Sequence, residues 1–180
     1  LISGGENKMK SKKIAFSSMF IAFGIILPMI FHTVNLAGNI FLPMHIPVLI
    51  GGFLLGPVCG MLIGIITPVL SGFMTGMPPI IPVMPIMAFE LCAYGFLTGY
   101  IFNKTKKIYI TLFCTMLGGR LFAVIGAYLV SITVAPKVNP LLFVFGNITM
   151  AIPGILIQLI FIPIFIKYLN NNLEIRRVLA

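Results

Sequence analysis

The sequence predicts an all-α integral membrane protein, a bundle of six transmembrane helices with both termini in the cytoplasm. Hydrophobic residues make up 59% of the 180 residues and charged residues only 8%, which is far less charge than the surface of a soluble domain needs. Six apolar segments are long enough to be membrane helices. The lysines and arginines then fall mainly on one side of the membrane, which fixes the orientation.

The helix bounds follow from the length of each apolar run. A transmembrane helix needs roughly 20 mainly apolar residues, because each residue rises about 1.5 Å. The second and third segments are divided at Gly56-Pro57, where proline favours a turn and a new helix start. Together these two segments have only about 33 residues, so at least one of them is short, tilted or re-entrant. The expected helices cover residues 14–31, 42–55, 57–74, 82–102, 108–134 and 141–167.

The basic residues decide the orientation, because positive charge accumulates on cytoplasmic loops. With the N-terminus inside, ten of the twelve lysines and arginines are cytoplasmic; the others are Lys137 in an outer loop and Arg120 within a helix. The net charge of +9 therefore matches anionic lipid of the inner leaflet, and the division of the charge among three clusters argues against a nucleic-acid partner. The cytoplasmic set is Lys8, Lys10, Lys12, Lys13, Lys104, Lys106, Lys107, Lys167, Arg176 and Arg177.

Residues 1–8 are expected to be a vector-encoded remnant before a natural start at Met9, so that residues 9–180 form a single membrane domain. Cys59, Cys92 and Cys114 fall in three different expected helices, without the spacing of a metal site. The sequence also has no P-loop and no hydrolase motif. We therefore expect no metal site.

Two isolated charges lie at membrane depth. Glu90 is one of only three acidic residues and lies about 12 Å below the outer end of the fourth expected helix. Arg120 lies about 21 Å below the outer end of the fifth, and nearer if that helix ends early or tilts. Charges inside a membrane are expensive, so they indicate a functional site.

Other polar residues gather toward the same outer half. The loop after the first helix contains His32, Asn35 and Asn39, the second helix has His45 near its start, and the sixth has Asn147 near its outer end. Mostly apolar walls with a few converging polar groups are typical of a small-molecule site. We therefore expect these five residues to bind a substrate together with the two buried charges.

Four of these seven residues also have a structural alternative. Glu90 and Arg120 would form a buried pair that fixes the register of two helices without touching a ligand. His45 would be a satisfied histidine at a helix end, and Asn147 would make a hydrogen bond between helices. The sequence leaves both sets of interpretations open.

The first helix has a stripe of small residues. Ser18 and Ala22 are four positions apart, which opens one face of the helix to close contact with another helix. The partner is either another subunit or a helix of this chain.

From Met9 onward the chain resembles the substrate-binding S components of energy-coupling factor (ECF) vitamin transporters. The resemblance rests on the size, the six expected helices and five short segments. These are residues 9–13 (MKSKK), 18–22 (SMFIA), 41–47 (FLPMHIP), 75–79 (TGMPP) and 88–91 (AFEL). Residues 18–22 are a relaxed version of the family's Ala-x-x-x-Ala docking pattern, with Ser18 in place of alanine.

The resemblance implies a multi-pass protein of a prokaryotic plasma membrane that captures a vitamin from outside and topples in the membrane to release it. Its partners would be an ECF transmembrane coupling subunit and two ATPase subunits, which use the ATP, so this chain would bind no cofactor and would not be an enzyme. A B-type vitamin is expected, with pantothenate matching Arg120 and a pyridoxine-like ring matching Glu90. The alternatives are a stand-alone channel or exchanger and a membrane enzyme that uses Glu90, His45 and His32 as acid and base.

Overall fold

The computed structural model describes the backbone of residues 2–32, 41–136 and 139–171, and side chains from Met9 to Phe31 and throughout the two later ranges. Within these ranges the chain forms helices and no strands. The helices are α1 (Ile2–His32), α3 (His45–Leu55), α4 (Pro57–Thr75), α5 (Val83–Thr105), α6 (Ile108–Thr133) and α7 (Pro140–Asn171). The all-α prediction is confirmed for this part of the chain.

The helix bounds agree with the sequence-based ones to within one residue except at four helix ends. Helices α5 and α7 end at Thr105 and Asn171 rather than at residues 102 and 167, because the helical backbone continues past the apolar run that was used to predict it. Helix α1 begins at Ile2 rather than at residue 14, because a helix continues through lysines where water rather than lipid surrounds it. Helix α3 begins at His45 rather than at residue 42, because Leu42 has a left-handed backbone (φ 48°) and Pro43 follows it. The boundary at Gly56-Pro57 is confirmed, with Gly56 at φ 89° between α3 and α4.

Five of the helices in the described ranges are long and apolar enough to cross a membrane. Helix α3 is the exception, since its 11 residues give a length of about 16 Å against the roughly 30 Å of the hydrocarbon core. The expectation of a short helix between residues 42 and 74 is therefore confirmed. The short helix leaves room at one end of the bundle.

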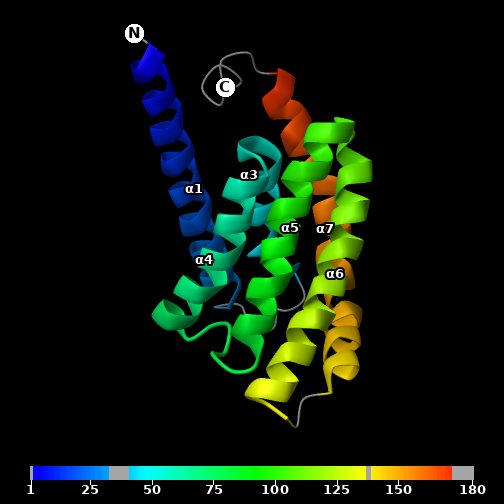
Figure 1. The fold of residues 1–180 in the computed structure, drawn as a ribbon. Helices are drawn as coiled ribbons and strands as arrows, with labels where there is room; N and C mark the ends of the chain where they lie inside the picture. The colour runs from blue at the N-terminus through cyan, green and yellow to red at the C-terminus, as the bar shows by residue number, and fades with distance from the viewer. Residues whose placement is uncertain (1, 33–40, 137–138, 172–180) are drawn as a thin grey trace.

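Figure 1 shows that α1 begins and α7 ends at the same end of the bundle, where the α3–α4 and α5–α6 connections also lie. The described lysines at or near these helix ends, such as Lys12, Lys107 and Lys167, are therefore gathered at one end of the molecule. The α4–α5 and α6–α7 connections lie at the opposite end. We call these the lysine end and the open end, and the positive-inside rule predicts that the lysine end faces the cytoplasm.

Helix α5 lies at the centre of the bundle and packs against α3, α4 and α6. Glycines allow the closest of these approaches, since a Cβ added to Gly64 would collide with the backbone of Leu91, and one added to Gly95 would collide with the backbone of Gly60. Between α5 and α6, Thr98 donates a hydrogen bond to Thr115 at 3.4 Å. This packing holds α5 and α6 at a fixed register, on which the site below depends.

Candidate functional site

The two isolated charges of the sequence meet inside the bundle. Arg120 on α6 and Glu90 on α5 form an ion pair, with 2.7 Å between Nη1 and Oε1. Their side chains are only 15% and 9% exposed. Since α5 and α6 run antiparallel and pack along their length, the pair also links these two helices at one depth. The expectation that both residues lie at a similar depth is therefore confirmed.

His45, the first residue of α3, completes the cluster. Its side chain is 2% exposed, and its Nε2 lies 3.7 Å from the same Glu90 oxygen that Arg120 contacts. The imidazole meets the ring of Tyr94 edge-on, with 5.3 Å between the ring centres. The N-terminal end of α3 places this histidine beside the ion pair. Three helices, α3, α5 and α6, thus each contribute one side chain to the cluster of His45, Glu90 and Arg120.

The cluster keeps unused hydrogen-bonding capacity. Four buried atoms have no hydrogen-bond partner among the described residues: both ring nitrogens of His45, Arg120 Nη2 and Glu90 Oε1, whose contact with Arg120 is short but poorly aligned for a hydrogen bond. A buried polar atom without a partner costs about 1–3 kcal/mol. Such groups in a native structure call for an explanation, and a bound ligand supplies one.

The three residues that carry these atoms line a cavity. A small chamber of about 80 Å³ is lined by the polar cluster together with apolar residues and Asn147. It shares five lining residues with a larger cavity of about 330 Å³, whose other walls include Pro28 of α1 and residues 77–79 of the α4–α5 connection. That connection is held by Ser71, which donates a hydrogen bond to the Met77 carbonyl at 2.6 Å. The five shared residues are Leu42, Val83, Met87, Phe143 and Asn147.

A family model described as ECF transporter, substrate-specific component matches residues 12–168 of the chain. The chain belongs to the family of ECF transporter substrate-specific components. Comparison with curated proteins and with solved structures gives no match. Membership of this family makes the chain a multi-pass membrane protein and the substrate-binding subunit of a transporter. The family consists of transporter subunits, which are not enzymes.

The structure brings four of the predicted site residues of this substrate-specific component together. Glu90, Arg120, His45 and Asn147 all line the small chamber. Glu90 and Arg120 do pair with each other, as one of the two interpretations has it, while Arg120 Nη2 and the ring nitrogens of His45 have no hydrogen-bond partner among the described residues. The other three predicted residues lie outside the described part: Asn35 and Asn39 entirely, and the side chain of His32, whose backbone ends α1.

Sequence reasoning missed Tyr94 and did not place Gln158 in the site. Tyr94 follows Glu90 by one helical turn, and this spacing is the signal that would have placed both on one face. Gln158 of α7 is buried and donates a hydrogen bond to the Leu42 carbonyl at 3.4 Å. It therefore joins α7 to the segment before α3, and it supports a residue that lines both the small chamber and the larger cavity.

Ser18 and Ala22 of this substrate-specific component are both exposed on α1. Nearby Gly24, in contrast, is buried, and a Cβ there would collide with the side chain of Thr67 on α4. The small residues at positions 18 and 22 therefore face away from the bundle. The alternative in which they pack against a helix of this chain does not hold.

No group of three or more histidine, cysteine, aspartate or glutamate side chains that would suit a metal ion occurs within the described ranges. His45 and Glu90 are adjacent, but their third neighbour is the cationic Arg120, which repels a metal ion. The chemistry of the cluster is that of hydrogen bonding and charge pairing. It suits recognition of a polar organic molecule.

Proposed function

We propose that this chain is the high-affinity subunit that captures a small water-soluble B-type vitamin from outside the cell. The observation that supports the proposal is the buried cluster of His45, Glu90 and Arg120, which lines an otherwise mainly apolar cavity and has atoms without a hydrogen-bond partner among the described residues. The cavities of about 330 and 80 Å³ are together of the size typical of small-molecule sites. The larger cavity is lined by residues 77–79 of the α4–α5 connection, which lies at the open end of the bundle, and the distribution of lysines predicts that this end faces the outside.

The chemistry of the cluster narrows the ligand. Arg120 Nη2 is a donor and suits a carboxylate, a phosphate or a hydroxyl oxygen. His45 can donate from one ring nitrogen and accept at the other. Because Glu90 already neutralises most of the arginine charge, a ligand with one acidic group or none, and with several hydroxyls, fits best. Pantothenate and a pyridoxine-like ring both meet this description.

The test of capture is a binding titration of the purified chain against a panel of B vitamins. We expect one vitamin to bind at one molecule per chain, without turnover. Conversion of the vitamin by the chain alone would favour an enzyme, and ion or solute flux through liposomes that contain only this chain would favour a channel or exchanger. Either result would contradict the proposal.

After capture, the loaded subunit is proposed to topple in the membrane and release the vitamin inside the cell. It does so on a module of an ECF transmembrane coupling subunit and two ATPase subunits, and the ATPase subunits hydrolyse ATP. Helix α1 offers the docking surface, because Ser18 and Ala22 are small and exposed.

Replacement of Ala22 with leucine is therefore expected to abolish vitamin uptake by cells while the purified protein keeps its affinity. The added side chain would separate α1 from the coupling subunit and would touch no residue of the cavity. Leu117→Ile, a conservative change on the exposed face of α6, is the matched control. Normal uptake by the Ala22→Leu variant would rule out docking at this position.

A further inference from the structure

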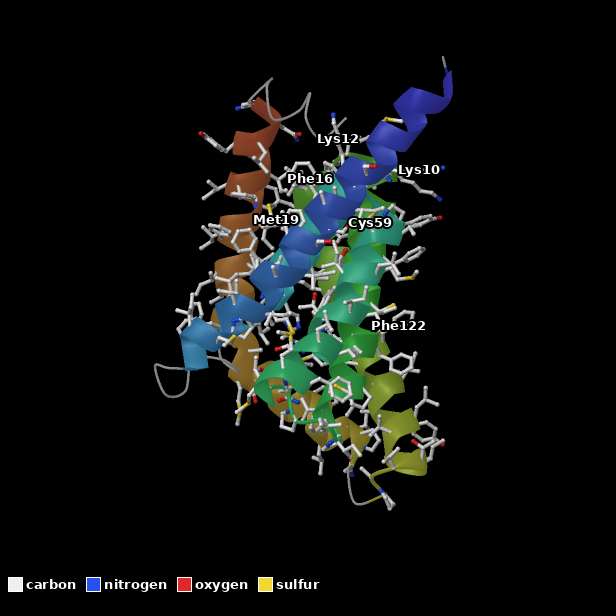
Figure 2. All side chains as sticks on the ribbon, turned by 90° about the vertical axis from the view of Figure 1, so that its left-hand side faces the viewer. Lys10, Lys12, Phe16, Met19, Cys59 and Phe122 are labelled. Atoms are coloured by element: carbon white, nitrogen blue, oxygen red, sulfur yellow. The ribbon has the colours of Figure 1, made fainter. Side chains whose placement is uncertain are left out.

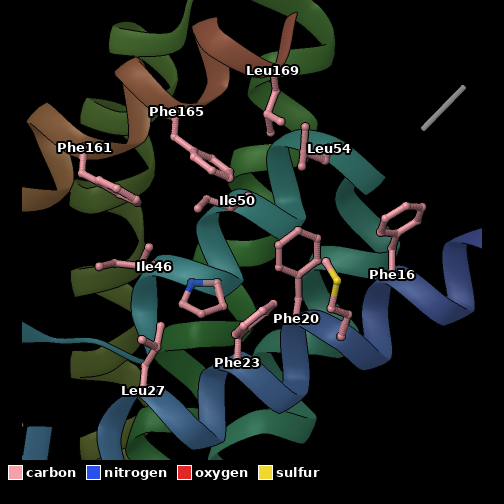
Figure 3. A pocket seen from close by; sticks show the side chains of 12 residues that line it. Phe16, Phe20, Phe23, Leu27, Ile46, Ile50, Leu54, Phe161, Phe165 and Leu169 are labelled. Carbon is pink, nitrogen blue, oxygen red and sulfur yellow. The ribbon is translucent and has the colours of Figure 1, made fainter. Parts of the chain in front are cut away.

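A second cavity lies on the other side of α3 and is entirely apolar. It is a groove of about 380 Å³ between α1, α3 and α7, and every residue that lines it is hydrophobic or proline. Figure 3 shows the aromatic rings of α1 and α7 on opposite walls, with α3 as the floor. Five of the lining residues are phenylalanines: Phe16, Phe20, Phe23, Phe161 and Phe165.

The length of this apolar groove corresponds to one leaflet of a bilayer. Along α1 it extends from Phe16 to Leu27, which is about 16 Å at the helical rise. On the floor it extends from Ile46 to Leu54, less than the length of the short helix α3 itself. Half of the hydrocarbon core is about 15 Å thick. A transmembrane helix of a partner would need a face of twice this length, whereas the chain of a single lipid would fit.

Positive charge stands at one end of the groove. Lys12 precedes Phe16 by four residues and Lys13 precedes it by three, so both lysines lie on the face of α1 that lines the groove. They lie one helical turn before Phe16, the first phenylalanine of the groove along α1. Lys12 is half-buried, whereas Lys10 is exposed and lies two residues away, toward the opposite side of the helix. Figure 2 shows Lys12 on the side of Phe16 and Met19, and Lys10 on the other side. An apolar slot with two cations at its mouth is complementary to a lipid with an anionic head group.

We propose that the groove binds one acyl chain of an anionic phospholipid from the leaflet at the lysine end, with the phosphate held by Lys12 and Lys13. The acyl chain of the lipid packs on Ile50 and Leu54 of α3. Helix α3 crosses only about half of the membrane, and its opposite side carries His45 of the polar cluster. The lipid thus fills the space beside α3, which is too short to span the membrane, and it supports the wall between the groove and the proposed substrate cavity.

The test uses the full chain in bilayer nanodiscs of equal parts phosphatidylglycerol and phosphatidylcholine, followed by release into mild detergent and native mass spectrometry. The wild type is expected to retain one phosphatidylglycerol. The double variant Lys12→Gln/Lys13→Gln is expected to retain it about thirtyfold less, because each lysine near an anionic head group contributes about fivefold in affinity. Lys10→Gln, a matched control on the other side of α1, is expected to retain it as the wild type does. Both changes are on the surface and leave the packed bundle intact.

A second pair of variants tests the groove itself. Leu54→Trp places a large ring in the groove and is expected to remove the retained lipid, whereas Leu117→Trp, on an exposed part of α6 outside the groove, is expected to leave it. The proposal is overturned if the wild type retains no lipid or retains both lipids equally, or if Lys10→Gln loses as much lipid as the double variant. It is also overturned if the groove variants keep the lipid but no longer assemble with the coupling subunit, since the groove would then be a protein-docking face.

Discussion

Two cavities flank the short helix α3, and they differ in chemistry far more than in size. The groove on one side has a volume of about 380 Å³ and only apolar walls. The cavity of about 330 Å³ on the other side adjoins the small chamber of about 80 Å³ that the polar cluster lines. Neighbouring residues of α3 divide between them: His45 faces the cluster and Ile46 faces the groove. Volume alone would therefore not distinguish the two cavities.

The difference comes from very few residues. Three side chains, one each from α3, α5 and α6, supply the polar groups of an otherwise apolar interior, and a charge in a low-dielectric interior acts strongly on whatever lies beside it. The same low dielectric makes these side chains costly when they lose a partner. Affinity for the vitamin should thus be sensitive to single substitutions in the polar cluster and insensitive to small changes of size on the groove side of α3.

The largest effect is expected from Arg120→Ala. This change leaves Glu90 buried without its partner, and breaking a buried ion pair on one side typically costs about 3–5 kcal/mol. Binding of the vitamin is expected to weaken at least about tenfold, since the donor Nη2 is lost as well. Thermal unfolding and vitamin titration in the same detergent measure both effects.

The double variant Glu90→Gln/Arg120→Gln is the control for this prediction. It removes both charges and leaves two amides that can form a hydrogen bond with each other. We therefore expect it to be more stable than Arg120→Ala but to bind the vitamin as weakly. Recovery of wild-type affinity by a well-folded double variant would show that the pair only holds α5 against α6.

A smaller effect is expected from His45→Phe. The phenyl ring keeps the edge-on contact with Tyr94 and removes both unpartnered ring nitrogens. The affinity for the vitamin is expected to fall about tenfold, with little change in the unfolding temperature, because a polar group is lost rather than a packed one. An unchanged affinity would mean that the ligand does not contact this histidine.

Asn147→Ala is expected to have a milder effect. Asn147 lines both the small chamber and the larger cavity, yet it is exposed, and a single neutral hydrogen bond contributes about 0.5–1.5 kcal/mol. We expect the affinity to fall about fivefold, as a vitamin titration would show. A loss as large as that of Arg120→Ala would place the asparagine at the centre of the site instead.

The smallest effect on binding is expected from Ile50→Val, on the groove side of α3. Ile50 is 5% exposed, and the loss of one methylene group from such a position typically costs about 0.5–1.5 kcal/mol of stability. The affinity for the vitamin should stay within about twofold of the wild type, because the side chain faces away from the cluster. A tenfold loss of affinity would show that the two sides of α3 are coupled.

The sequence predicted much of the fold and the centre of the site, for identifiable reasons. Gly56-Pro57 divides two apolar runs, and isolated charges such as Glu90 and Arg120 stand out in a chain with so few of them. The start of α3 was predicted three residues too early, because the left-handed backbone of Leu42 has no signature in an apolar run. Orientation rests on the distribution of lysines and remains a prediction.

The apolar groove was not predicted, and its absence from the sequence analysis has a physical cause. In a chain where 59% of the residues are hydrophobic, the residues that line a groove cannot be told from those that face lipid, since lipid and protein interior favour the same side chains. The unpartnered atoms of His45 and Arg120 likewise became visible only once the neighbours of each atom were known. Both features depend on the arrangement of helices rather than on the pattern along any one of them.

The central claim is that the cluster of His45, Glu90 and Arg120 holds the transported vitamin, and native mass spectrometry tests it most directly. The protein would be purified gently from the cells that produce it and compared with the Glu90→Gln/Arg120→Gln variant. We predict a single retained mass that matches a B vitamin in the wild type and its loss from the folded variant. A vitamin retained equally by both proteins would contradict the account, because the ligand would then be bound somewhere else in the chain.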